Sequence, residues 1–395
     1  MPTPPAPWPS PGGCVGRPFT CRSPAVHGPY DLPRYVPGMR SRLAAALVLA
    51  AVAVAGCGTD DNSSRLKAGR PPAAPVAGAN DRATLSGAGA TFPATLVQEW
   101  IKHYGGLAPR VTINYQPIGS GAGIQQLTSK TVDFAGSDVP LKASEVEATG
   151  GAGAVVQVPW TAGGVAVEYN LPGIDSLRLT PQTLAAIFAG RVTKWNDPAI
   201  KAENPNASLP GSGIQVVHRS DGSGTTQVFT DYLKAVAPDI WTFPSTKDWP
   251  ASTPGTGAKG SDGVTAAVKQ SAGAIGYAEP SYPKQAGLAI ATIRNQAGRF
   301  VAPEATAVSA ALAAATVKAD GSLALNFTAP SPEAYPISSA SYLMFYRAAS
   351  DAARDTALRH FAAWALTEGQ ALAEGLDYAP LPEPVQMAAL AAVKL

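Results

Sequence analysis

Four short segments of the sequence combine small residues with groups that can bind an anion. They are Gly87–Phe92, Gly119–Gly123, Ser137-Asp138 and Arg219–Thr225. Three of them place glycines and hydroxyls immediately before an expected helix. A helix start leaves backbone N–H groups unsatisfied and carries a partial positive charge, which favours an anion. The sequence therefore offers three candidate anion-binding helix starts.

Side chains in these segments add to the donors of the backbone. The hydroxyl donors are Thr91, Ser120, Ser223 and Thr225. Arg219 supplies a planar, permanently charged fork that suits a tetrahedral oxyanion, and Asp221 could hold that fork in place. Each feature alone also has a structural explanation: a capped turn, a surface ion pair for Arg219, or a helix cap for Asp138. Spacing in the sequence does not show that the segments converge.

The elements that must position these groups follow an alternating pattern. From residue 84 onward, short β-like runs alternate with amphipathic helical patterns, which is typical of a layered α/β fold. The expected strands are Val111–Tyr115, Ala154–Val158, Val165–Tyr169, Ile214–His218 and Ala274–Tyr277.

Two expected helices, Pro93–Tyr104 and Thr225–Val236, carry the same stripe of apolar residues, which buries one face of each helix on a sheet. Another helix is expected after Ser120. Thr180 is the expected N-cap of a helix that starts at Pro181 and ends at Gly190. We expect the C-terminal segment to be mostly helical, over Ala352–Leu366 and Val385–Val393.

Length, charge and cysteine content limit the classes of protein to which the chain can belong. The chain has 395 residues, of which 15% are charged, and a net charge of +2. That length suffices for two domains, and the near-neutral charge without a Lys/Arg block argues against a nucleic-acid partner. The three cysteines are too few for a disulfide framework.

The N-terminal part resembles an export signal. Residues 39–56 read as a signal peptide, because a short basic region precedes an apolar run that is shorter than the about 20 residues of a membrane span. The order Val54-Ala55-Gly56-Cys57 resembles the lipobox of bacterial lipoproteins, in which Cys57 is lipidated. The alternative is a buried apolar segment with an incidental cysteine, but the polar tract that follows argues against burial.

The segments on either side of this signal complete the N-terminal organisation. Residues 1–38 are interpreted as a spurious or disordered leader, with translation starting near Met39. Residues 57–83 are rich in Gly, Ala and Pro and are expected to form a flexible tether.

Several motifs together resemble one family. In the same order and at similar spacing, the chain is similar to the phosphate-binding proteins of high-affinity bacterial phosphate ABC transporters. The motifs that carry this resemblance are Gly87–Pro93, Gly119–Gly123, Thr131–Asp138, Lys194–Ile200, Arg219–Thr225, Gly260–Glu279 and Leu376–Pro382. The resemblance implies an α/β, two-domain periplasmic-binding-protein fold of type II. The domains would comprise residues 84–164 plus 336–395, and residues 165–335, with hinges near Gly163-Gly164 and Pro336.

The resemblance also implies a binding site, partners and a location. The first domain would contribute Thr91, the Phe92 N–H, Ser120 and Asp138; the second would contribute Arg219, Ser223, the Gly224 N–H and Thr225, with Asp221 paired to Arg219. The implied partners are inorganic phosphate and the permease of an ABC transporter. The protein would be a monomer without a metal or cofactor, held by Cys57 on the outer face of the cytoplasmic membrane.

The alternatives to phosphate binding are hydrolysis of phosphate esters and binding of another oxyanion. A phosphate-ester hydrolase is disfavoured because His103, His218 and His360 have no metal-ligand spacing, and because the sequence has neither a G-x-S-x-G elbow nor a nucleotide-binding P-loop. We therefore expect no enzymatic activity. A receptor for another oxyanion, such as sulfate or molybdate, is the nearer alternative. Asp138 together with Arg219 favours an oxyanion that carries a proton.

Asp138 generates a prediction about selectivity. Phosphate near neutral pH keeps a proton that a carboxylate can accept, whereas sulfate would face a buried, unpaired acceptor. A site built on one specific hydrogen bond can reject the analogue that lacks it by about 10⁴–10⁵. We expect Asp138→Asn to admit sulfate relatively better, as measured by competitive titration. An unchanged phosphate-to-sulfate preference would contradict this role.

Overall fold

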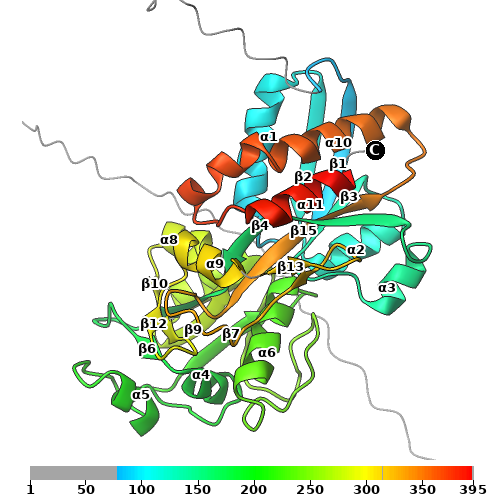
Figure 1. Ribbon diagram of the computed structural model, residues 1–395. Helices are drawn as coiled ribbons and strands as arrows, with labels where there is room; N and C mark the ends of the chain where they lie inside the picture. The colour runs from blue at the N-terminus through cyan, green and yellow to red at the C-terminus, as the bar shows by residue number, and fades with distance from the viewer. Residues whose placement is uncertain (1–77, 314, 394–395) are drawn as a thin grey trace, which may run out of the picture. The chain divides into compact units, whose positions relative to one another are not determined.

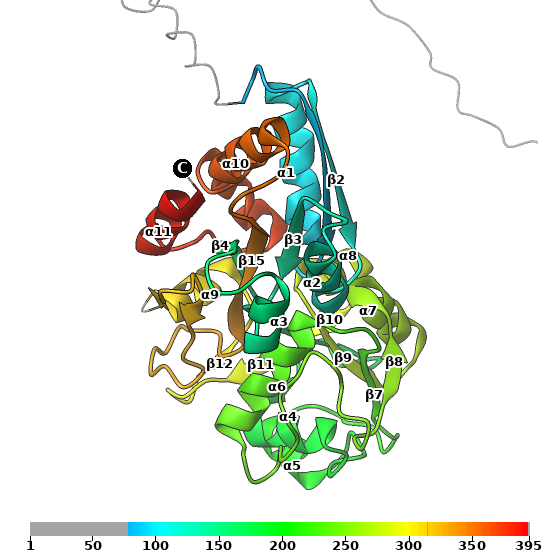
Figure 2. The same ribbon diagram turned by 90° about the vertical axis from the view of Figure 1, so that its right-hand side faces the viewer.

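The computed structural model describes residues 78–313 and 315–393. The predicted leader 1–38, the signal peptide 39–56, Cys57 and residues 58–77 of the tether lie outside the described residues. Within the described part, sheets flanked by helices confirm the predicted α/β class (Figures 1 and 2). No helix of that part has the length and hydropathy needed to span a membrane.

One five-stranded sheet organises the first lobe, in the order β2-β1-β3-β15-β4. Strand β1 lies parallel to β2 and β3, whereas β15 runs antiparallel to β3 and β4. The strands are β1 (Ala83–Gly89), β2 (Val111–Pro117), β3 (Phe134–Ser137), β4 (Val155–Gly164) and β15 (Ser338–Tyr346). The strand predicted over Val111–Tyr115 is therefore confirmed as β2, and that over Ala154–Val158 as the start of β4.

Helices cover both faces of this sheet. On one face lie α1 (Ala94–Leu107), α10 (Ala352–Ala365) and α11 (Glu383–Val393), with the 3-10 turns η2 (Glu368–Leu372) and η3 (Glu374–Leu376); on the other lie α2 (Ser120–Thr128) and α3 (Ala143–Ala148) (Figures 1 and 2). The apolar stripe of α1 is buried as expected, and Trp100 packs edge-on against Trp160 with ring centroids 5.6 Å apart.

A second five-stranded sheet, in the order β10-β5-β9-β7-β8, organises the second lobe. Its strands are β5 (Ala166–Asn170), β7 (Gln215–Arg219), β8 (Thr256–Ala258), β9 (Ala274–Ala278) and β10 (Ala289–Ile290). Its helices are α4 (Pro181–Phe188), α5 (Pro198–Glu203), α6 (Gly224–Val236), α7 (Gly260–Gln270) and α8 (Ser281–Ala286). A smaller sheet joins β6 (Arg178–Leu179), β11 (Thr292–Arg294) and β12 (Phe300–Val301), followed by α9 (Ala305–Leu312).

Local chemistry explains the elements of the second lobe. The Thr180 hydroxyl accepts from the Thr183 N–H, which confirms the predicted N-cap, and Gly190 has the positive φ of 73° expected after the helix end. The core is aromatic: Phe229 stacks on Tyr277 with centroids 4.5 Å apart, and Phe188 meets Phe229 edge-on at 4.8 Å.

Two of the crossings of the chain between the lobes lie side by side. Strand β4 ends at Gly164 and β5 begins at Ala166, so the first crossing is nearly direct. The returning chain lies beside it, because the Val165 N–H donates to the Ile337 carbonyl at 2.8 Å and the Tyr335 hydroxyl donates to the Val165 carbonyl at 2.7 Å. The two crossings therefore form one short, hydrogen-bonded connection.

Two segments differ from the sequence-based expectation. The C-terminal helices expected over Ala352–Leu366 and Val385–Val393 are confirmed as α10 and α11, but strand β15, which was not expected, precedes them and lies between β3 and β4. The hairpin of β13 (Thr316–Val317) and β14 (Leu323–Ala324) falls in the range expected for the second domain but packs on the first lobe. There the Gln157 side chain donates to the Asp320 carbonyl, and the Leu323 N–H donates to the Tyr342 hydroxyl.

The first described residues lie against the first lobe. Gly78 to Asp81 form a turn, and the Asp81 carboxylate pairs with the His360 ring at 2.6 Å. The Arg110 guanidinium donates to the Asn80 carbonyl. The last part of the range 57–83, expected to be tether, is thereby attached to α10 and to the start of β2.

Candidate functional site

Four helices begin where parallel strands end, and their starts meet between the lobes. Helices α1 and α2 follow β1 and β2, while α6 and α7 follow β7 and β8. In a right-handed β-α-β arrangement, this places helix N-termini at the carboxyl edges of the sheets, where α/β proteins bind ligands. The starts of α2 and α6 touch directly, because the Gly121 N–H donates to the Gly222 carbonyl at 2.8 Å.

The predicted site residues are brought together at this junction and are buried. The eight positions are Thr91, Phe92, Ser120, Asp138, Arg219, Ser223, Gly224 and Thr225. Among their polar side chains, the largest exposed fraction is 3%, at Asp138. Contacts that join the two lobes run directly between members of this set. The convergence that spacing alone left open is therefore present in the structure.

Asp138 is the acidic centre of the junction. It directly follows β3, and its Oδ2 accepts a hydrogen bond of 3.0 Å from the Thr225 hydroxyl of the other lobe. Its Oδ1 accepts one of 3.0 Å from the Ser341 hydroxyl. Burial raises the pKa of Asp138 to about 6, while the two hydroxyls and the nearby Arg219 oppose that rise. At neutral pH the carboxyl group therefore remains mostly ionised and able to accept a hydrogen bond.

Arg219 is held by Asp221 in the predicted pair. Its Nε donates to Asp221 Oδ1 at 2.8 Å, and its Nη2 donates to Oδ2 at 2.5 Å. This two-point contact lowers the pKa of Asp221 against the effect of its partial burial. The Gly260 N–H at the start of α7 also donates to Asp221 Oδ1, at 3.0 Å. The guanidinium is thus fixed in one orientation, and no acceptor among residues 78–313 and 315–393 contacts its Nη1.

The hydroxyl oxygens of Ser120 and Ser223 accept hydrogen bonds from backbone N–H groups, and each hydroxyl keeps its own proton to donate. Ser120 Oγ accepts from the N–H groups of Asp138 and Gly224, at 3.3 and 3.1 Å. Ser223 is the N-cap of α6, and its oxygen accepts from the Thr226 N–H at 3.1 Å. Each hydroxyl proton therefore remains able to point at a ligand.

Thr91 and Phe92 stand at the start of α1. The Thr91 hydroxyl lies 2.8 Å from that of Ser261, and the Ser261 N–H donates to it at 3.2 Å. The Tyr378 hydroxyl donates to the Phe92 carbonyl at 2.7 Å, and Tyr282 donates to the Thr91 carbonyl at 2.6 Å. The bonds to Ser261 and Tyr282 hold the first turn of α1 against the second lobe, and the bond from Tyr378 attaches it to the C-terminal part of the first lobe.

Two residues that the sequence analysis did not single out take part in this junction. Ser261 is the second residue of α7 and lies in the family motif Gly260–Glu279. Its place next to Gly260, ahead of the apolar residues of that motif, was the available signal. Ser341 lies in β15, more than two hundred residues from Asp138 in the sequence. Nothing in the local pattern around Ser341 indicated that contact.

An ion pair bridges the lobes beside the site. Glu145 of α3 meets Lys247 of the second lobe, with Oε1 and Nζ 2.5 Å apart and both side chains mostly buried. The Lys247 carbonyl in turn accepts from the Ser223 N–H at 2.8 Å. The same residue therefore joins the α6 start to the first lobe.

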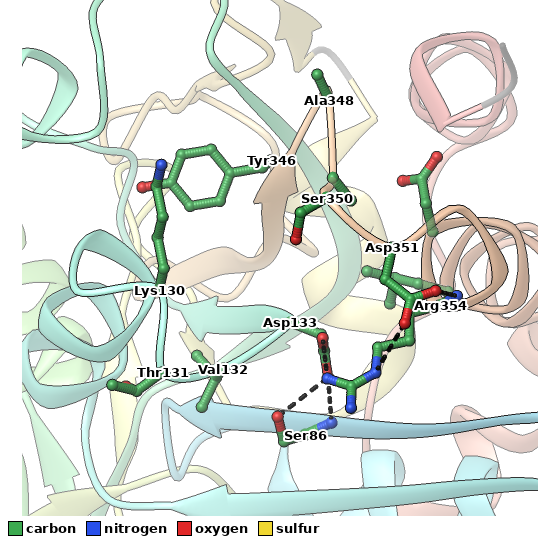
Figure 3. Close-up of a pocket in the computed structure, with 13 residues that line it drawn as sticks. Ser86, Lys130, Thr131, Val132, Asp133, Tyr346, Ala348, Ser350, Asp351 and Arg354 are labelled. Carbon is green, nitrogen blue, oxygen red and sulfur yellow. Dashed lines mark hydrogen bonds and ion pairs between the residues drawn. The ribbon is translucent and has the colours of Figure 1, made fainter.

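A cavity of about 250 Å³ lies elsewhere in the first lobe (Figure 3). It is lined by the loop 130–133, the end of β15 and the first turn of α10. Asp133 accepts from the Ser86 N–H at 2.7 Å and from Arg354 at 3.3 Å, and Arg354 also meets Asp351 at 3.6 Å. Because these acidic and basic groups pair with one another, we place the candidate site between the lobes instead.

Comparison with known proteins places these features in a family. The model of the PBP superfamily domain matches residues 74–368. The phosphate-binding protein PstS of Xylella fastidiosa is 38% identical over 346 residues, covering 84% of this chain and 92% of that protein. The phosphate-binding protein PstS of Pasteurella multocida is 40% identical over 309 residues, covering 76% and 87%.

A solved structure has the same fold. It is that of a high affinity periplasmic phosphate-binding protein (PfluDING) bound with phosphate, which is 26% identical. The two structures have a TM-score of 0.66, and the match covers 78% of this chain and 93% of that one. This likeness agrees with the predicted periplasmic-binding-protein fold of type II.

The close approach of the lobes at Gly224 gives a prediction. A Cβ atom at this position would lie 2.8 Å from the Asp138 backbone nitrogen and 2.6 Å from Ser120 Oγ, which is too close. We expect Gly224→Ala to hold the lobes apart, with a larger radius of gyration by small-angle X-ray scattering. Gly222→Ala is the matched control, since its Cβ would meet its nearest neighbour at an ordinary 3.5 Å. Equal compactness of both variants would contradict the prediction.

Proposed function

The chain belongs to the PBP superfamily and, by its identity with the relatives above, to the phosphate-binding proteins, and we propose that it captures inorganic phosphate for an ABC importer. The observation that carries this function is the pairing of Asp138 with donors from both lobes at the meeting point of four helix starts. A site of N–H and hydroxyl donors with one carboxylate acceptor suits an oxyanion that has kept a proton.

We assign the ligand contacts to the predicted residues. Arg219, the hydroxyls of Thr91, Ser120, Ser223 and Thr225, and the N–H groups of Phe92 and Gly224 would donate to phosphate oxygens. Asp138 would accept a hydrogen bond from the protonated oxygen of phosphate. Asp221 would act through Arg219, because it fixes the fork in a geometry that a tetrahedral anion can meet.

Binding and closure are proposed to be one event. Phosphate would contact both lobes only when they are together, so it stabilises the closed arrangement over the open one. The paired crossings at Val165 and Ile337 would be the hinge, since few residues there need to change their backbone angles. We retain as a proposal the division into 84–164 plus 336–395 and 165–335, with the hairpin of β13 and β14 moving with the first lobe.

Location and partners complete the proposal. The protein would work outside the cytoplasm, attached to the membrane by a lipid on Cys57, and would deliver phosphate as a monomer to the permease. It would not act as an enzyme, because Asp138 and Arg219, the groups that could attack or activate a substrate, would be occupied in binding phosphate. Among residues 78–313 and 315–393, no cluster of His, Cys, Asp and Glu forms a metal site.

Titration tests this function directly. Residues 58–395, freed of bound ligand, should bind one phosphate at micromolar strength or tighter by isothermal titration at neutral pH. Sulfate under the same conditions should give no heat of binding. Sulfate or molybdate binding in place of phosphate would support the other-oxyanion function, and turnover of a generic phosphate ester would support a hydrolase.

The Glu145–Lys247 ion pair generates a kinetic prediction. Because it forms only when the lobes meet, its loss should speed phosphate release while leaving the phosphate-to-sulfate preference unchanged. An exposed pair contributes up to about 1 kcal/mol and loss of one partner of a mostly buried pair costs more, so Lys247→Met should release phosphate at least about fivefold faster in stopped-flow measurements. Lys142→Met is the control, since Lys142 lies 4.0 Å from the same carboxylate but on the same lobe. Equal release rates in both variants would argue against a role in closure.

A further inference from the structure

Strand β15 carries the serine that reaches Asp138 from behind the proposed ligand site. Tyr342 opposes Ser137 in the antiparallel pairing of β15 with β3, which puts Ser341 beside Asp138, the next residue along the chain. Ser341 is completely buried, and its Oγ lies 3.0 Å from Asp138 Oδ1. The same hydroxyl lies 3.3 Å from the Ser137 carbonyl. With one proton to donate, it favours the closer, charged acceptor.

A bulge at this position aims the side chain. On the β4 side, Ser341 pairs with Thr161 but Tyr342 pairs with Pro159, so one residue of β4 is extra at this point of the ladder. Bulges redirect side chains beside functional sites. The strand register and the bulge together hold the Ser341 hydroxyl on Asp138, independently of the second lobe.

The geometry points to Ser341 as the positioning residue that keeps Asp138 a proton acceptor and thereby sets the choice of phosphate over sulfate; this inference rests on the proposed function. Thr225 also donates to Asp138, but it comes from the second lobe and is present only on closure. Ser341 belongs to the same lobe as Asp138. The carboxylate would therefore keep one oriented donor while the lobes are open and the ligand enters.

The charged and titratable groups around Asp138 define what a pH experiment can report. Arg219 of β7 favours its ionised form. Burial raises the pKa values of Tyr115 on β2 and Tyr282 on α8, and nearby carboxylates that include Asp138 add to the rise, so both phenols remain neutral at working pH. Burial raises the pKa of Asp138 to about 6, and the Ser341 hydroxyl opposes that rise. Removal of the hydroxyl therefore moves the titration of Asp138 to higher pH.

The test measures phosphate affinity of the purified protein from pH 5 to 8.5 by isothermal titration. In the wild type, affinity should rise with pH as Asp138 ionises, over and above the change due to the ionisation of phosphate itself. Ser341→Ala should shift this rise to higher pH, because a protonated Asp138 donates where it should accept. Phosphate ionisation is common to both proteins, so the difference between their profiles reports on Asp138.

Sulfate supplies the second readout. A protonated Asp138 can donate to an oxyanion without a proton, so the phosphate-to-sulfate affinity ratio of Ser341→Ala at pH 7 should fall about tenfold, the scale of one hydrogen bond to a charged group. Ser339→Ala is the matched control. Ser339 lies on the same strand, is 1% exposed, and donates only to the Ala340 carbonyl. Its profile and its ratio should match those of the wild type.

The outcomes separate this inference from the proposed function. If the wild type does not bind phosphate, the proposed function fails. If it does bind, a Ser341→Ala profile and ratio equal to the wild type would overturn the role of Ser341, as would an equal effect of Ser339→Ala. Should Ser341→Ala not fold, Ser341→Cys retains the size with a weaker donor and should give a smaller shift in the same direction. A Ser341→Cys profile equal to that of the wild type would likewise overturn the inference.

Discussion

Asp138 carries negative charge in a buried position where the lobes meet, and each of its oxygens needs a donor there. Burial alone would favour the neutral acid, which donates, whereas the proposed ligand needs an acceptor. Donors therefore arrive from three directions: Ser341 from the same sheet, Thr225 from the opposite lobe, and the charge of Arg219 nearby. Much of the surrounding architecture can be understood as the support of these groups.

The positive side of the site is restrained in a comparable way. Arg219 gives two of its donors to Asp221, which is itself held by the Gly260 N–H at the start of α7. An ion pair of this kind limits both the mobility and the net charge of the fork. Backbone N–H groups at helix starts then supply donors that cannot titrate. Recognition would thus depend on directed hydrogen bonds more than on an excess of positive charge.

The topology allows these parts to come from two lobes. Each sheet contains parallel β-α-β units beside antiparallel strands, so each presents two helix starts at one edge, and these edges face one another. Two of the crossings between them lie side by side around Val165 and Ile337. Direct contacts such as Gly121 with Gly222 and Glu145 with Lys247 then hold the lobes together. The lobes can come this close at Gly224 only because this residue has no side chain to meet Ser120 and Asp138.

Local signals in the sequence were sufficient for most elements and for the candidate donors at the helix starts, whereas the full set of site residues came from the family resemblance. The apolar stripes of α1 and α6, the Thr180 N-cap and the glycine-rich helix starts depend on residues a few positions apart, so they can be recognised along the chain. Local signals could not show that the four helix starts converge, what Ser261 contacts or what role β15 has. Ser341 meets Asp138 because of a strand register and a bulge formed with distant strands. Such contacts depend on which strands pair in the sheet and in which register, and the residues next to Ser341 in the sequence do not determine that pairing.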